Sequence, residues 1–136
     1  MKLYSITIML IAVVLALTSC SGNSFKQIKN EDIVEVSVWA NLPENDWSTF
    51  TKELTDDELS NFILLYNKSQ YNGKSSGEGG TPDFGAIIKF KNGDSYSLNQ
   101  FAGKSDFEVV MKNHQSFYLN NSDMFDYLNE ISSEFQ

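Results

Sequence analysis

The chain has 136 residues, and its 10 basic residues against 18 acidic ones give a formal net charge of −8 at pH 7. Because such an acidic surface repels phosphate backbones, we expect no nucleic-acid partner. The single cysteine excludes a disulfide within the chain, and together with the single histidine it leaves too few ligands for a zinc site of these residues.

The first twenty residues have the layout of an export signal. Lys2 supplies a positive charge, residues 6–17 form an almost unbroken apolar run, and the small residues Thr18 and Ser19 follow. A membrane-spanning helix needs about 20 apolar residues, so this run is too short to span a bilayer. We therefore expect residues 1–19 to be a signal peptide that is cleaved from the mature protein.

The end of this signal, Leu17-Thr18-Ser19-Cys20, resembles the lipobox of bacterial lipoproteins. The resemblance covers the first twenty residues only, and it implies cleavage before Cys20 by a peptidase of the signal peptidase II type. It also implies that the Cys20 thiol carries a lipid. Because each buried CH₂ contributes about 0.8 kcal/mol, two or three acyl chains (palmitate, for example) hold a protein on a membrane. The alternative is an ordinary secretory signal followed by an unpaired cysteine.

The same resemblance implies a place in the cell envelope. In lipoproteins of this kind an aspartate after the cysteine favours retention at the inner membrane, and here Ser21 stands at that position. The resemblance therefore implies the outer membrane in a Gram-negative cell and the outer face of the plasma membrane in a Gram-positive cell.

The mature chain divides into a short tether and one domain. Residues 20–32 are interpreted as the lipidated cysteine and a polar tether, and residues 33–136 as a single domain. A tether of a dozen residues reaches at most about 40 Å, so we expect the domain to sit close to the bilayer.

The first half of the domain predicts a strand followed by a helix. Residues 33–40 alternate, so we predict a strand whose inward face carries Val34, Val36, Val38 and Ala40. Residues 41–51 are predicted to be a loop or a short strand folded back on the domain. Residues 55–70 are predicted to be a helix, because Thr55 and Glu58 form a capping box and four apolar residues follow at helical spacing: Leu59, Phe62, Ile63 and Tyr66. The acidic run Asp56-Asp57-Glu58 is interpreted as capping and not as a metal site.

The second half predicts a hairpin, further strands and a final helix. Residues 71–83 are glycine-rich, and we interpret them as a mobile surface loop in preference to a binding loop. Asn92-Gly93 predicts a two-residue turn between strands at residues 84–91 and 94–101, which pairs Ile88 with Ser97 and leaves Tyr96 on the solvent side. Residues 107–112 predict a strand with Phe107, Val109 and Met111 facing inward, and residues 115–119 predict a short strand. Asn121 or Ser122 is the predicted start of the last helix. We therefore predict an α+β fold, with a small antiparallel sheet of about four to five strands and two helices packed on it.

No spacing of residues indicates catalysis. The lipidation that the resemblance implies would remove Cys20 as a nucleophile. His114 lies in a polar junction between strands, where we expect it to be exposed and not catalytic. The acidic residues do not follow a calcium-loop pattern. We therefore expect no catalytic residue, metal or cofactor.

The aromatic residues on the solvent side are the only indication of a binding surface. We expect Trp39, Trp47 and Tyr96 to lie near one another, with Tyr71 close by, as a surface for a protein, peptide or glycan. The alternative is that they form a second small core. The sequence thus favours a membrane-anchored envelope lipoprotein with a non-enzymatic binding or interaction domain. The first alternative is an immunity or inhibitor lipoprotein against a protein toxin or hydrolase, and the second is an envelope hydrolase. The oligomeric state stays open.

Overall fold

The computed structural model describes residues 25–42, 48–77 and 79–135. The predicted signal peptide, Cys20 and Trp47 lie outside these residues. The described part contains one antiparallel sheet with the strand order β2-β1-β4-β5-β6-β7-β3. Its strands are β1 (Ile33–Leu42), β2 (Ser48–Glu53), β3 (Gln70–Lys74), β4 (Phe84–Phe90), β5 (Ser95–Gln100), β6 (Asp106–Met111) and β7 (Ser116–Asn120).

The α+β class and the two helices packed on an antiparallel sheet are confirmed, but the sheet has seven strands and not four to five. The additional strands, β2 and β3, form the two edges of the sheet. Residues 70–74 therefore do not belong to the predicted glycine-rich loop. An edge strand has a neighbour on one side only, so its sequence needs less of the apolar alternation that reveals an inner strand.

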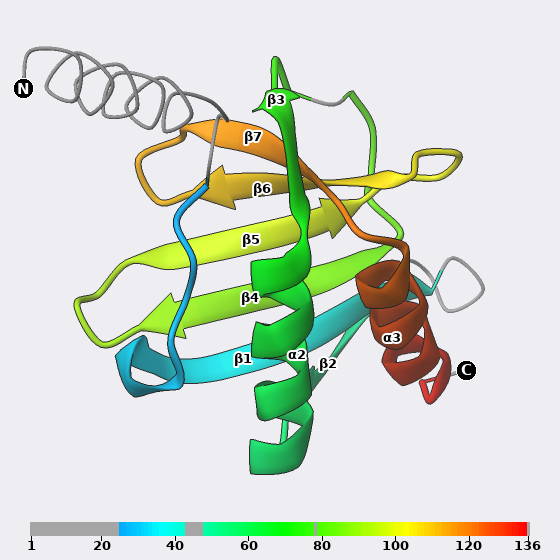
Figure 1. Cartoon of the computed structure of the whole chain (residues 1–136). Helices are drawn as coiled ribbons and strands as arrows, with labels where there is room; N and C mark the ends of the chain where they lie inside the picture. The colour runs from blue at the N-terminus through cyan, green and yellow to red at the C-terminus, as the bar shows by residue number, and fades with distance from the viewer. Residues whose placement is uncertain (1–24, 43–47, 78, 136) are drawn as a thin grey trace, which may run out of the picture.

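Both helices cover the same face of the sheet (Figure 1). Helix α2 (Asp56–Lys68) begins at the predicted cap, where the Glu58 N–H donates to Thr55 Oγ1 and the Thr55 N–H donates to the Glu58 carboxylate. Helix α3 (Ser122–Ser133) begins at Asn121, whose side-chain oxygen accepts from the Met124 N–H. Helix α2 connects β2 to β3 and thus crosses from one edge of the sheet to the other.

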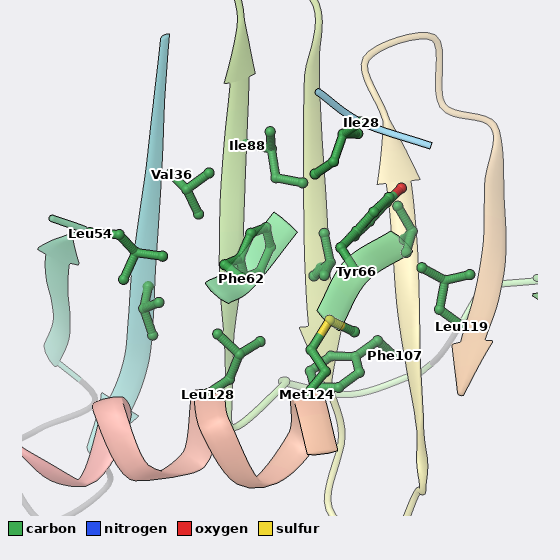
Figure 2. Packing of buried hydrophobic residues seen from close by; sticks show 14 of the residues in the cluster. Ile28, Val36, Leu54, Phe62, Tyr66, Ile88, Phe107, Leu119, Met124 and Leu128 are labelled. Carbon is green, nitrogen blue, oxygen red and sulfur yellow. The ribbon is translucent and has the colours of Figure 1, made fainter. Parts of the chain in front are cut away.

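The core lies between this helical layer and the sheet (Figure 2). Phe62 and Tyr66 point from α2 toward the sheet, and Met124 and Leu128 point from α3. All four side chains are fully buried. Burying an aromatic or large aliphatic side chain contributes about 1.5–3 kcal/mol, so this layer supplies most of the stability of the domain.

The turn between β4 and β5 is one residue longer than predicted. The Gly93 N–H donates to the Phe90 carbonyl, and the Phe90 N–H donates to the Asp94 carbonyl, each at 3.0 Å. Three residues, Lys91 to Gly93, therefore form the turn, and Gly93 takes the left-handed conformation with φ 86°.

This extra turn residue shifts the pairing of β4 with β5 by one position. Ile88 pairs with Tyr96 and not with Ser97. Because side chains alternate along a strand, Tyr96 moves to the face that the helices cover. The predicted place of Tyr96 on the solvent side is wrong.

A similar local shift changes the start of β1. The pairing of β1 with β4 is irregular between Ile33 and Glu35, so Ile33 takes the core position and Val34 is 62% exposed. Val36, Val38 and Ala40 face the core as predicted.

The N-terminal segment, residues 25–29, belongs to the domain. It runs across the helix-covered face from the side of β7 toward β1 (Figure 1), and a short 3₁₀ turn, η1 (Asn30–Asp32), joins it to β1. Ile28 is 3% exposed, and the Asn67 side-chain amide holds it by accepting from its N–H at 2.9 Å and donating to its carbonyl at 2.8 Å. Part of the segment that was predicted to be a tether therefore packs on the domain.

Candidate functional site

A cleft with a volume of about 510 Å³ opens between the N-terminal segment, β3 and the hairpin of β6 and β7. This volume lies in the range of sites for small organic ligands, about 300–1,000 Å³. We call it the aromatic cleft, and its lining residues are Phe25, Lys26, Tyr71, Lys74, Ser75, Tyr96, Met111, His114, Gln115, Ser116 and Phe117.

The floor of the aromatic cleft is apolar because four neighbouring strands each contribute one large side chain. These side chains are Tyr96 from β5, Met111 from β6, Phe117 from β7 and Tyr71 from β3. Phe25 of the N-terminal segment stacks on Phe117 with ring centroids 6.3 Å apart, and Tyr71 lies 5.9 Å from Phe117. Aromatic faces and a flexible methionine together adapt to apolar ligands of varied shape.

The rim of the aromatic cleft is cationic, although the chain is strongly acidic. Lys26, Lys74 and His114 are exposed side chains among the lining residues, and the lining residues include neither aspartate nor glutamate. Among the described residues, the ion pairs involve other lysines: Lys29, Lys52 and Lys89. The aromatic cleft therefore has a half-buried apolar floor below a positive rim.

His114 occupies a backbone position that usually takes glycine. The turn between β6 and β7 repeats the turn between β4 and β5, since the His114 N–H donates to the Met111 carbonyl and the Met111 N–H donates to the Gln115 carbonyl, each at 2.9 Å. His114 thus stands where Gly93 stands in the other turn, and its φ is 64°. A residue with a side chain costs about 1–2 kcal/mol in this conformation. The chain therefore carries an imidazole at the rim at some expense of stability.

A buried hydroxyl lies directly behind the aromatic cleft. Tyr66 packs edge-on against Phe25, with ring centroids 5.3 Å apart, and its hydroxyl has no hydrogen-bond partner among the described residues. Figure 2 shows this hydroxyl at the side of the core where Ile28 lies. Burial raises the pKa of Tyr66, and the nearby Tyr96 adds to this effect. Burial also raises the pKa of Tyr96, with a further contribution from Asp94.

The structure does not bring the predicted binding aromatics together. Trp39 is 8% exposed and lies over Gly85 on the face opposite the helices, where a side-chain carbon at position 85 would come within 2.9 Å of its ring. Tyr96 lies on the other face, so the predicted cluster of Trp39 and Tyr96 is wrong. Tyr71 and Tyr96 do meet, but they meet in the aromatic cleft.

Sequence reasoning missed most residues of the aromatic cleft. Phe25 and Lys26 fall in the predicted tether, Lys74 in the predicted loop, and His114 was interpreted only as an exposed loop residue. The predicted inward positions of Met111 and Phe107 were the available signal, but the cleft becomes visible only when β3 is placed beside β7.

The face opposite the helices carries carboxylates that are already hydrogen-bonded. Asp106 accepts from the side-chain amides of Asn72 and Asn120, and Glu108, which is 5% exposed, accepts from the Ser75 hydroxyl. A polar hollow of about 390 Å³ borders Asp106. These carboxylates hold strands together, since each bond joins two different segments of the chain.

The environment shifts two carboxyl groups, and it shifts both of them downward. A hydrogen bond from Ser37, with help from Lys89, lowers the pKa of Glu35. Lys52 lowers the pKa of Glu58 to about 2, with further contributions from Thr55. Neither group holds a proton near neutral pH, as a general acid must.

No model of a protein family matches the chain, and neither the curated proteins nor the solved structures contain a match. Among the described residues, the helices are too short or too polar to cross a membrane, and three or more potential metal ligands do not gather at any point.

Proposed function

We propose that the protein is a lipid-anchored protein of the bacterial cell envelope whose domain binds a small, largely apolar ligand in the aromatic cleft. The cleft itself carries this proposal, because a hollow of about 510 Å³ with an aromatic floor is the usual form of a ligand site. A binding module, unlike an inhibitor that presents a flat acidic patch, needs such a concave site.

The proposed anchor at Cys20 places the aromatic cleft near the bilayer. Phe25, which lines the cleft, follows Cys20 by five residues, so the two lie at most about 18 Å apart along the chain. A ligand that is released from the membrane or that diffuses along its surface therefore meets the cleft close to the membrane surface.

The anchor is tested by replacing Cys20 with alanine. We expect the wild-type chain to sediment with membranes and to incorporate radiolabelled palmitate, and Cys20→Ala to do neither. Ser21→Ala serves as the matched control and should behave as the wild type. Sedimentation of Cys20→Ala with membranes after a wash at high salt contradicts the anchor.

Two methionines make ligand binding in the cleft directly observable. After removal of residues 1–19 the chain keeps Met111, which lines the aromatic cleft, and Met124, which is fully buried in the core. In the lipidated protein on phosphatidylcholine nanodiscs, labelled with [¹³C-methyl]methionine, we expect 1-octanol to shift the Met111 methyl signal and to leave Met124 in place. Met124 thus reports any general disturbance of the fold.

A pair of variants assigns that shift to the aromatic cleft. Tyr71→Glu puts a charge into the cleft wall and should abolish the response of Met111 to octanol. Leu64→Glu makes the same kind of change at a residue of α2 that is 51% exposed, and it should preserve the response. An unresponsive Met111 in the wild-type protein contradicts the proposed ligand site.

A further inference from the structure

We propose that the ligand of the aromatic cleft is an amphipathic anion, a single alkyl chain that ends in a carboxylate, with the carboxylate held by Lys26 and Lys74. This inference rests on the proposed ligand-binding function and adds the chemical class of the ligand. The ligand is taken up as a free molecule and not as a lipid of the bilayer.

The first support is the contrast in charge between the aromatic cleft and the rest of the chain. The chain has a formal net charge of −8, yet the described residues that line the cleft include two lysines and neither aspartate nor glutamate. Opposite charge at a site selects its ligand and suppresses wrong ones. A cationic ligand would meet the lysines with no compensating group, and a neutral ligand would leave them unused.

The second support is that the charged side chains of the aromatic cleft are exposed, whereas its large apolar side chains are half-buried or buried. Lys26 of the N-terminal segment and Lys74 of β3 are exposed, while the side chains of Tyr71, Tyr96 and Met111 are half-buried. A molecule with an apolar chain and an anionic head matches this arrangement when the chain enters first. Burial of the chain supplies affinity at about 0.8 kcal/mol per CH₂, and the head sets the orientation.

The third support concerns the source of the ligand. Bacterial membrane surfaces that carry anionic lipids repel a domain with a strongly negative net charge. This repulsion opposes direct docking of the cleft onto such a bilayer, but it acts weakly on a single small anion in solution. A cleft of about 510 Å³ is also suited to one chain. The free single-chain carboxylate is therefore the occupant that the charges favour.

The test compares three ligands with the same chain and different heads: octanoate, 1-octanol and octylammonium. Binding is read from the Met111 methyl signal of the full lipidated protein on phosphatidylcholine nanodiscs, with free ligand measured by dialysis. We expect octanoate to bind roughly tenfold more tightly than octylammonium, and more tightly than octanol, since two exposed ion pairs each contribute modestly. This preference should shrink as salt is added.

Variants assign the selectivity to the two lysines. Lys26→Gln combined with Lys74→Gln should reduce the affinity for octanoate to the affinity that the same variant has for octanol. Lys29→Gln combined with Lys68→Gln removes the same charge from residues that do not line the cleft, and it should keep the preference.

Each outcome decides between the two proposals. Equal affinity for the three ligands, or a preference that survives in the Lys26 and Lys74 variant, overturns the inference and leaves the ligand-binding function standing. A Met111 signal that responds to none of the ligands overturns both. If phosphatidylglycerol nanodiscs shift Met111 without added octanoate, the occupant is a membrane lipid, and the free carboxylate is wrong.

Discussion

The two edges of the sheet use their cations in opposite ways. At the β2 edge, Lys52 lies 2.9 Å from carboxylate oxygens of both Glu58 and Glu134, a group we call the Lys52 cluster. These two carboxylates raise the pKa of Lys52. At the β3 edge, Lys26 and Lys74 border the aromatic cleft with no carboxylate among its lining residues.

This difference separates a site that holds the fold together from a site that is open to a ligand. The Lys52 cluster joins β2, the start of α2 and the end of α3. Each of its three charged groups therefore forms an ion pair within the domain. The lysines of the aromatic cleft make no such contact in the described residues. In an acidic chain, cations that form no ion pair within the described residues are the ones that remain available to an external anion.

The largest effect that we expect is a loss of stability when the Lys52 cluster is disrupted. Glu58→Ala removes the capping box and the partner of Lys52, and we expect it to lower the free energy of unfolding by about 2 kcal/mol. Asp57→Ala is the matched control. The carboxylate of Asp57 stabilises the helix only through its interaction with the helix dipole, which contributes about 0.3–1 kcal/mol to the free energy of unfolding. Urea unfolding measures both.

The lower stability of Glu58→Ala should not weaken the binding of octanol in the aromatic cleft. Octanol should still shift the Met111 signal of Glu58→Ala under folding conditions, because Glu58 does not line the aromatic cleft. A loss of that response would show that the two edges are coupled and would end the division between them.

The Lys52 cluster should contribute to the pH dependence of stability through Glu58. The folded-state pKa of Glu58 is lowered to about 2 from an ordinary value of 4.5. Its contribution is therefore complete above pH 4.5 and is lost as the pH falls from 4.5 toward 2. Because the side chain is 25% exposed and water screens the pair, we expect a loss of about 1.5 kcal/mol.

Glu58→Gln isolates this contribution from those of other acids. The difference in unfolding free energy between the wild type and Glu58→Gln should be largest near pH 6 and should shrink toward zero at pH 2. A difference that stays constant over this range excludes the shifted Glu58 carboxyl as its cause.

The sequence predicted the inner part of the fold better than its edges, and the reason is burial. In β1, β4 and β6 an apolar side chain recurs at every second position on the face that the helices cover, and this period predicted the three strands. The capping box at Thr55 is a local interaction and was confirmed. The edge strands β2 and β3 have fewer buried neighbours, and their sequences contain no comparable alternation.

The aromatic cleft could not be predicted, because it depends on long-range order. Tyr71 and Phe117 are separated along the chain by a hairpin and several strands, and they meet only because β3 pairs with β7. One extra turn residue, Lys91, moved Tyr96 from the predicted solvent side to the cleft. Local patterns do not determine either event, since strand order and register arise from the packing of the whole sheet.

The two edges also differ in the hydrogen bonding of a tyrosine hydroxyl. The Tyr127 hydroxyl donates to the Glu58 carbonyl at 2.9 Å, beside the Lys52 cluster, whereas the buried Tyr66 hydroxyl behind the aromatic cleft has no partner in the described residues. A buried polar group without a hydrogen bond costs about 1–3 kcal/mol. We therefore expect Tyr66→Phe to raise the free energy of unfolding by about 1 kcal/mol and Tyr127→Phe to lower it by a similar amount.

The decisive result is that the two substitutions, Tyr66→Phe and Tyr127→Phe, change the free energy of unfolding in opposite directions. Thermal and urea unfolding of both variants under one set of conditions measure these two changes. If Tyr66→Phe destabilises the protein as Tyr127→Phe does, the Tyr66 hydroxyl has a bound water as its partner, and it is not an unsatisfied group behind the cleft.

The smallest expected effect concerns the two turns that end the hairpins beside the aromatic cleft. His114 and Gly93 occupy the same left-handed position, with φ 64° and 86°. His114→Gly relieves the side-chain cost of this conformation but adds backbone entropy to the unfolded chain, so we expect a net gain of about 0.5 kcal/mol. Gly93→His should cause a loss of about 1 kcal/mol, because it imposes the same strain on the other turn.

The His114→Gly variant also tests why the chain keeps a histidine there. The imidazole lines the aromatic cleft, so its removal should weaken octanoate binding about twofold to threefold while the protein becomes more stable. A stabilised variant with unchanged octanoate affinity would mean that His114 contributes nothing to the ligand. A gain in stability with a loss of affinity is the result expected of a residue retained for binding, because the same turn with glycine is already present in the molecule at Gly93.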